Sequence, residues 1–142
     1  MDTMKKHKGI LNTLASIAIS SEETLTAKLA AAIVLNNRIV AIGYNRRKSD
    51  PLQARFSKNE SAIYLHAEIH SLKNSLKLLD VEELTKCSIY ICRVKKVRPK
   101  SKEYVWGIAK PCSGCMRAIR EFGIKNIIYS SDETGKYEVM DV

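Results

Sequence analysis

Apolar residues recur at two spacings along the chain, and these spacings predict its helices and strands. From residue 3 to 19 they repeat every three or four positions, which is typical of an amphipathic helix. Two apolar runs, 29–35 and 38–43, flank Asn36-Asn37. Because Asn tolerates positive φ, this pattern predicts a β-hairpin with a tight turn. The first run is apolar throughout, as in a central strand buried on both faces.

The same signals predict further helices and strands downstream. Helices are predicted at 63–79 and 112–122, and strands at 87–94, 124–130 and, as a short last one, 137–142. Gly123 is placed to end the second of these helices. The polar, basic segments 44–61 and 95–110 predict long loops, the first with Asp50-Pro51 as a breaker. With no repeat or linker, residues 1–142 are expected to form a single three-layer α/β domain around one mixed sheet.

Composition limits the class of protein. The chain has 142 residues, of which 45% are hydrophobic, so it can bury one core and is not expected to be disordered. Its apolar run at 29–35 is far shorter than the roughly 20 residues of a membrane-spanning helix. Lysines near the N-terminus precede a stretch with helical spacing rather than an export signal. The four cysteines are therefore expected in a reducing cytoplasm, where paired thiols more often bind metal than form disulfides.

Two short motifs carry the candidate chemistry. His66-Ala67-Glu68 lies near the start of one predicted helix, and Pro111-Cys112-Ser113-Gly114-Cys115 lies at the start of the next. One imidazole and two thiolates form a ligand set that can hold a catalytic zinc ion and leave its fourth position open to water. The Cys-x-x-Cys spacing lets both sulfurs converge from one helical turn, where the helix N-terminus favours thiolates.

The spacing of His66 and Glu68 sets a geometric condition. On a regular helix the two side chains would point roughly 200° apart, so the pair must lie at an irregular helix start to face one metal. There Glu68 can move protons between water and a leaving nitrogen. Either motif alone is weak, because Cys-x-x-Cys also occurs in redox pairs and structural zinc sites. Together they match the H-x-E and P-C-x-x-C signature of zinc-dependent nucleobase deaminases.

The other histidine and cysteine residues of this region are expected to pack. His66 and His70 lie four positions apart, but the H-E-x-x-H order of zincins is absent, so His70 is expected to support the fold or the site rather than to bind metal. Cys87 and Cys92 flank a predicted strand with no histidine nearby. They are interpreted as small buried hydrophobes.

Across residues 29–129 the sequence resembles the cytidine deaminase superfamily. The resemblance implies an α/β/α sandwich with a mixed sheet of about five strands. It implies one zinc ion held by His66, Cys112 and Cys115, with Glu68 as the proton shuttle. An oligomer is expected, as is common among such enzymes.

The resemblance also implies substrate contacts. Asn45, at the end of the second predicted strand, would contact the substrate sugar, and backbone groups of Ala67 and Pro111 would read the base edge. Gly43-Tyr44-Asn45 and the segment 122–129 are similar to the deoxycytidylate deaminase branch. The implied reaction is hydrolysis of dCMP to dUMP and ammonia. Arg46 stands where regulated members usually have Gly, which argues against an allosteric nucleotide site.

Positive charge is concentrated in two segments. The net charge of the chain is +9, and residues 46–58 and 93–128 carry net charges of +4 and +8. Both flank the predicted zinc site, where they could bind a nucleotide phosphate or steer a nucleic-acid strand. Tyr104 and Trp106 could stack on a base or pack in the core. A deaminase of tRNA or single-stranded nucleic acid is therefore an alternative, and a non-catalytic, zinc-stabilised basic binding module is another.

Overall fold

The computed structural model describes residues 3–21, 27–57 and 64–142. The helices within these ranges are α1 (Thr3–Ser20), α2 (Pro51–Ser57), α3 (Ala67–Ser75), α4 (Val81–Leu84) and α5 (Ser113–Glu121). The strands are β1 (Lys28–Leu35), β2 (Arg38–Tyr44), β3 (Ser88–Lys96), β4 (Tyr104–Gly107), β5 (Asn126–Ser130) and β6 (Tyr137–Asp141).

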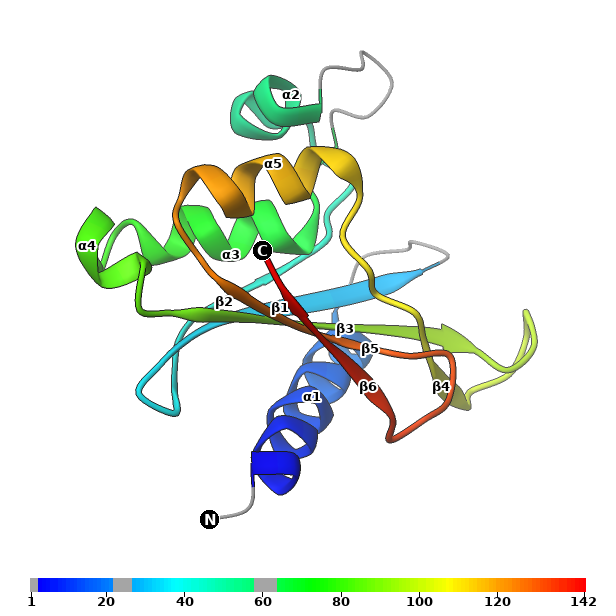
Figure 1. Ribbon diagram of the computed structural model, residues 1–142. Coiled ribbons are helices and arrows are strands. Elements are labelled where there is room, and N and C mark those ends of the chain that lie inside the picture. The colour runs from blue at the N-terminus through cyan, green and yellow to red at the C-terminus, as the bar shows by residue number, and fades with distance from the viewer. Residues whose placement is uncertain (1–2, 22–26, 58–63) are drawn as a thin grey trace.

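One mixed sheet lies between two layers of helices. Its strand order is β2-β1-β3-β5-β6, and β4 pairs with the far end of β3. Only the β3–β5 pair among the described strands is parallel. Figure 1 shows α1 on one face of the sheet and α3, α5 and α2 on the other. The predicted three-layer α/β architecture is therefore confirmed.

The central strands are buried on both faces because their side chains pack in two cores, one on each side of the sheet. In β3, Ile89 and Ile91 pack in the core under α3 and α5, whereas Tyr90 and Cys92 pack in the core under α1. β1 lies between β2 and β3, as its uninterrupted apolar sequence predicts. The predicted hairpin is also confirmed: the turn residues of the β1–β2 connection, at 36–37, have φ of 50° and 67°.

The sheet has six strands in the described ranges, one more than expected. The sequence predicts a loop at 95–110, but β3 continues to Lys96 and the chain returns as β4. Trp106 pairs with Val94 and is only 4% exposed, in the core on the α1 side, with Tyr104 packed against it. Trp106 therefore has the core-packing role, and Tyr104 is half-buried against the same core.

The sequence also predicts a loop at 44–61, and residues 51–57 instead form α2. Asp50 Oδ1 accepts hydrogen bonds from the backbone N–H groups of Leu52 and Gln53 at 2.9 and 3.2 Å. Asp50-Pro51 is thus a helix start with an acidic cap and a proline in the first turn, rather than a breaker. The part of this prediction at 58–61 falls outside the described residues.

The helix predicted at 63–79 is shorter and is followed by a second helical segment. α3 covers 67–75, and α4 begins after Asp80, whose side chain forms a capping box with Glu83. Residue 63 falls outside the described ranges. Gly123, with φ of 81°, follows the end of α5 as predicted.

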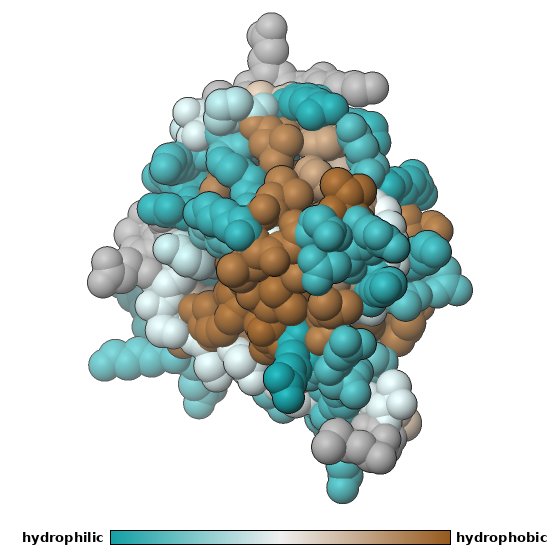
Figure 2. All heavy atoms as spheres, turned by 90° about the vertical axis from the view of Figure 1, so that its left-hand side faces the viewer, coloured by the Kyte–Doolittle hydropathy of each residue, from teal (hydrophilic) through white to brown (hydrophobic). Residues whose placement is uncertain are grey.

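One side of the molecule carries an extended apolar surface. Figure 2 faces the left-hand side of Figure 1, where α4 and the β1–β2 turn lie, and apolar side chains gather at its centre. Exposed apolar residues of β2, of the α3–α4 connection and of α4 are Ile39, Leu76, Leu78 and Val81. Such surfaces often mark protein contacts. No helix within the described ranges is both long and apolar enough to cross a bilayer.

Candidate functional site

His66 and Cys112 each lie immediately before a helix. His66 is the N-cap of α3 with φ −86° and ψ 155°, and Cys112 is the N-cap of α5 with φ −69° and ψ 169°. Neither side chain caps its own helix. Both are therefore available to meet between the two helix starts. The irregular helix start that the spacing of His66 and Glu68 requires is confirmed.

The side chains of His66, Cys112 and Cys115 converge on one point. Their ligand atoms all lie within 4.8 Å of one another. His66 Nδ1 is 3.3 Å from Cys115 Sγ and 3.7 Å from Cys112 Sγ. A tetrahedral zinc ion with ordinary Zn–S and Zn–N bonds would place such N and S atoms about 3.6 Å apart. The donor set and these two N–S distances therefore fit a zinc ion.

The electrostatics of one of the donors, Cys112, also suit a metal. Hydrogen bonds from Cys115 and His66 lower the pKa of the Cys112 thiol to about 3, so this group is a thiolate at neutral pH. Thiolates are the form that binds metal. The start of α5 adds the positive end of the helix dipole. The described residues hold no disulfide, and all four cysteines are free.

Glu68 lies in the first turn of α3, beside this cluster. It is 4% exposed, and burial raises the pKa of its carboxyl group. It is one of the few buried acidic side chains of the described chain, together with Asp50, which is paired with Lys73 at 2.6 Å. No such ion pair to Glu68 is present in the described part of the chain. A buried carboxyl group without a cationic partner is suited to exchanging protons.

A cavity of about 250 Å³ opens onto the cluster. Pockets that enclose drug-sized ligands measure roughly 300–1,000 Å³, so this one is of a size for a small ligand. It is lined by Leu29, Asn45, His66, Ala67, Glu68, Arg93, Ile108, Ala109, Lys110 and Cys112. Of the predicted substrate contacts, Asn45 and Ala67 thus line the cavity. Pro111 is buried and lies between two lining residues without lining the cavity itself.

The Asn45 amide is already engaged with the backbone. Its Oδ1 accepts from the N–H of Leu29 at 2.9 Å, and its Nδ2 donates to the carbonyl of Ala27 at 2.9 Å. These bonds join the end of β2 to the start of β1. Asn45 therefore helps to form one wall of the cavity by holding these two strand ends together.

The position of α3 depends on close contact with β2. A Cβ on Gly43 would lie 2.3 Å from the backbone N of Ser71 and 2.8 Å from the carbonyl O of Ala67, so only glycine lets the helix lie this close. Asn74 Nδ2 donates to the carbonyl of Ile42 at 2.8 Å. These contacts fix the helix that carries His66 and Glu68.

His70 and the two remaining cysteines have the packing roles predicted for them. His70 Nδ1 accepts from the backbone N–H of Tyr44 at 3.0 Å, and its ring packs edge-on against that of Tyr44. His70 is not part of the metal-type cluster. Cys87 and Cys92 are 2% and 0% exposed. Burial raises the pKa of both thiols, that of Cys92 to about 12.

α2 is hydrogen-bonded both to the start of α3 and to α5, the helices that carry the two motifs. The sequence did not predict this contribution. The fully buried Gln53 accepts a hydrogen bond from the backbone N–H of His66 through Oε1 at 2.9 Å, and its Nε2 donates to Ser57 Oγ at 2.8 Å. At the other end, Arg117 of α5 donates to the carbonyls of Phe56 and Ser57. The signal that could have located α2 is Asp50-Pro51, which resembles a helix start.

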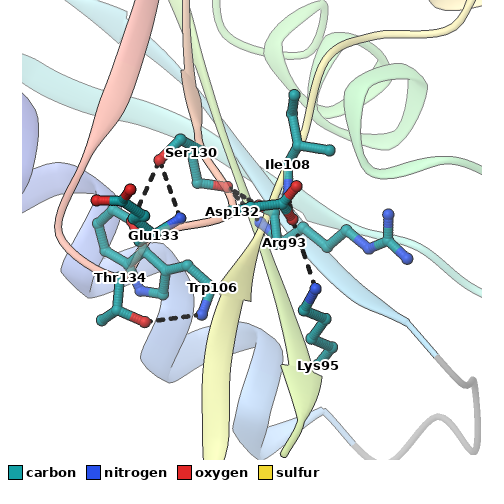
Figure 3. Close-up of polar contacts among 10 residues, drawn as sticks. Arg93, Lys95, Trp106, Ile108, Ser130, Asp132, Glu133 and Thr134 are labelled. Carbon is teal, nitrogen blue, oxygen red and sulfur yellow. Dashed lines mark hydrogen bonds and ion pairs between the residues drawn. The ribbon is translucent and has the colours of Figure 1, made fainter.

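The approach to Cys112 is held by a polar network around the β3–β4 pair (Figure 3). Ser130 Oγ accepts from the backbone N–H of Arg93 at 3.0 Å and donates to the carbonyl of Gly107 at 2.7 Å. Asp132 accepts from the backbone N–H of Ile108 at 3.2 Å and from Lys95 at 3.5 Å. The segment that leads into Pro111 and Cys112 is thus fixed at its start.

The basic segments contribute less to the cavity than their sequence position suggests. Among the described basic residues, Arg93 and Lys110 line it. Arg55 instead pairs with Glu121 at 2.9 Å, and Arg117 holds α2. Sequence reasoning does not single out Arg93, because a basic residue near the end of a strand gives no signal of the face to which it points.

Comparison with protein families decides the classification. The family model described as the cytidine and deoxycytidylate deaminase zinc-binding region matches residues 4–131. The chain belongs to this deaminase family. The family model and the His/Cys/Cys cluster together support one Zn²⁺ ion as cofactor. Comparison with curated protein sequences gives no match.

Solved structures show the same deaminase fold. Cytidine deaminase from Burkholderia pseudomallei is 16% identical, with a TM-score of 0.60 over 95% of this chain and 91% of that one. Cyanophage S-TIM5 dCMP deaminase, in complex with dCMP and dUMP, is 20% identical, with a TM-score of 0.57 over 91% and 82%. Bacillus subtilis guanine deaminase is 21% identical, with a TM-score of 0.55 over 92% and 65%. The cytidine deaminase-like fold is confirmed, and these neighbours differ in substrate.

Proposed function

We propose that this member of the deaminase family is a zinc-dependent hydrolase that converts dCMP to dUMP with release of ammonia. The observation that carries the proposal is the meeting of three zinc-type donors with a buried carboxyl group, Glu68, on one small cavity. Membership of the family supports hydrolytic deamination in general. The choice of dCMP rests on the Gly43-Tyr44-Asn45 motif and on the likeness to a dCMP deaminase among the solved structures.

In this proposal the residues of the two motifs divide the work. His66, Cys112 and Cys115 hold the zinc ion. Zinc in such a site supplies Lewis acidity that lowers the pKa of water from 15.7 toward about 7. Glu68 would accept a proton from water as the water oxygen adds to the amidine carbon of the base, and would deliver that proton to the ring nitrogen. It would then take the proton of the added hydroxyl group and pass it to the amine, so that the C–N bond breaks, ammonia leaves and the carbonyl forms. The buried position of Glu68 keeps bulk water from competing for that proton.

Three further residues position the substrate. Asn45 lines the cavity wall beside the sugar, and the backbone of Ala67, at the start of α3, faces the base edge. The backbone carbonyl of Pro111, immediately before Cys112, would also read the base edge, although Pro111 is buried and does not itself line the cavity. Because both polar groups of the Asn45 amide already bond to backbone, a sugar hydroxyl would share the remaining lone pair of Oδ1.

The test is a substrate panel read by mass spectrometry. Purified protein is incubated with dCMP, deoxycytidine, cytidine, guanine, tRNA and single-stranded DNA. Product from dCMP at a higher kcat/KM than from deoxycytidine or cytidine is expected. Product only from tRNA or DNA would overturn the proposal in favour of the nucleic-acid alternative. No product from any substrate, in protein that contains zinc, would favour a binding module.

Two expectations from the sequence stay predictions. A homo-oligomer is consistent with the apolar surface around Ile39, Leu76, Leu78 and Val81 (Figure 2), and light scattering of the purified protein tests it. A cytoplasmic location is consistent with four free cysteines, and fractionation of cells that express the protein tests it.

A further inference from the structure

Arg93 extends from the end of the sheet into the candidate site. Residues of β3 alternate between faces, and Arg93 shares the face of Ile89 and Ile91, which pack under α3 and α5. It lines the same cavity as Glu68 and Cys112. In Figure 3 its side chain extends away from the Asp132 network, beside Ile108, and no dashed line reaches its guanidinium group.

The Arg93 side chain is unpaired although part of it is buried. Its Nε is buried and has no hydrogen-bond partner, the only such side-chain nitrogen or oxygen atom in the described part of the chain. No ion pair joins it to a described carboxylate. Asp132, the acidic neighbour in Figure 3, instead bonds to Lys95 and to the backbone of Ile108. A buried cationic donor left unsatisfied is costly, so a partner from outside the chain is expected.

The surroundings hold the Arg93 side chain in place for such a partner. The backbone N–H of Arg93 is fixed by Ser130 Oγ at 3.0 Å. Its aliphatic stem lies over Gly107, where a Cβ would come within 3.1 Å of Cδ. Because Gly107 has no side chain, there is space for the aliphatic stem of Arg93. This part of the side chain is confined, which lowers the entropy cost of binding a ligand.

The charge of the cavity selects an anion. Lys110 is a second basic lining residue, and Glu68 is the carboxyl group among the lining residues, beside the proposed zinc ligands His66 and Cys112. Planar guanidinium groups bind phosphate through paired hydrogen bonds, and a lysine adds charge without that geometry. Arg93 thus offers the directional contact and Lys110 an additional positive charge at the same opening.

We propose that Arg93 is the residue that makes this enzyme prefer a nucleotide to a nucleoside, by binding the phosphate of the substrate while the base lies at the zinc cluster. The inference rests on the proposed deaminase function. A nucleoside would leave the Arg93 guanidinium unpaired, so discrimination comes from both the added contact and the unsatisfied donor. A phosphate monoester and a phosphodiester both present non-bridging anionic oxygens that a guanidinium group can bind, and binding measurements with each separate them.

Binding of the reaction product gives a readout without turnover. Calorimetry with dUMP and with deoxyuridine is carried out on the wild type, Arg93→Gln and Arg93→Lys. Arg98→Gln is the matched control, because Arg98 is exposed on the β3–β4 connection and does not line the site cavity. Arg93→Gln is expected to weaken dUMP binding about 10- to 100-fold and to leave deoxyuridine binding unchanged. The dUMP affinity of Arg93→Lys should lie between those of the wild type and Arg93→Gln, and the dUMP affinity of Arg98→Gln should match that of the wild type.

The outcomes separate this inference from the proposed function. Equal dUMP binding by wild type and a folded, zinc-loaded Arg93→Gln overturns the role of Arg93, even if dCMP is deaminated. Loss of dUMP binding in Arg93→Gln supports that role, even if the wild type proves inactive on dCMP. If a phosphodiester such as a dinucleotide with central phosphate binds through Arg93 and dUMP does not, the monoester preference is overturned. Circular dichroism and zinc content show whether each variant is folded.

Discussion

Oε1 of Gln53 accepts a hydrogen bond from the backbone N–H of His66 at 2.9 Å, which joins the buried side of α2 to the start of α3. Gln53→Leu keeps a similar volume but leaves this N–H without a partner. The variant is expected to lose about 1–3 kcal/mol of unfolding free energy. Zinc affinity should fall about 10- to 100-fold, since residues that orient a metal ligand typically have effects of that size.

Chelator competition and urea denaturation measure these two effects of Gln53→Leu. Ser57→Ala is the matched control, because it removes the partner of Gln53 Nε2 and leaves the bond to His66 intact. It should bind zinc as the wild type does. Wild-type zinc affinity in Gln53→Leu would show that α2 does not position His66.

Two glycines make a matched pair for the contact between α3 and β2. Gly43→Ala would place Cβ 2.7 Å from the carbonyl C of His70, so either the helix or the strand must shift. We expect a loss of about 1–3 kcal/mol of stability or more, with reduced activity. Gly9 lies exposed on α1 with no atom within 4 Å of its Cβ position. Gly9→Ala should therefore stabilise the protein by about 0.5–1 kcal/mol. Equal thermal unfolding temperatures for the two variants would contradict the close contact at Gly43.

Zinc content tests the proposed ligand set. Protein prepared without chelator should hold about one zinc per chain, and Cys112→Ala should lose it because only two donors would remain. Cys87→Ala is the control, since Cys87 is buried outside the cluster. Metal analysis by plasma mass spectrometry gives the ratio. Equal zinc content in Cys112→Ala and the wild type would exclude Cys112 as a ligand.

His7 links stability to pH on the opposite face of the sheet. Its Nδ1 lies 2.6 Å from the hydroxyl of Tyr90, and its ring packs against Tyr90 and Tyr137. Burial, and then the nearby charge of Lys6, lowers its pKa below the ordinary 6.5. The folded state therefore disfavours the protonated ring. The unfolding free energy that the neutral His7 ring contributes is fully present above about pH 6.5, and it is lost as the pH falls toward the lowered pKa.

We therefore expect His7→Asn to lose less unfolding free energy than the wild type between about pH 7 and pH 5. Part of the decrease in unfolding free energy with falling pH should remain in His7→Asn, because burial also lowers the pKa of His70. Urea denaturation at several pH values measures it. Identical pH profiles for the two proteins would rule out this role of His7.

The metal-type cluster is predictable from sequence because its information is local. The Cys-x-x-Cys motif places two donors within four residues and the second short motif supplies His66, so the sequence predicts the three residues whose ligand atoms lie within 4.8 Å of one another. The central strand is predictable for the same reason, since β1 is apolar at every position that faces either core.

What the sequence does not reveal depends on tertiary contacts. α2 is held by a buried amide and by Arg117 from a distant helix, so its seven residues look like a polar loop in isolation. β4 is a short strand formed by pairing with β3, and its basic flanks are typical of a loop. Arg93 points into the cavity because alternate residues of β3 face opposite sides of the sheet. Which residues face which side is fixed only by packing in the two cores.

The most direct test of the account is the rate of dCMP deamination by Glu68→Gln, measured in protein that retains about one zinc per chain. Glutamine keeps the shape of the side chain but cannot exchange a proton, so the rate should fall at least about 100-fold while zinc content stays unchanged. A zinc-loaded Glu68→Gln that deaminates dCMP at the wild-type rate would contradict the role of Glu68 and, with it, the proposed mechanism.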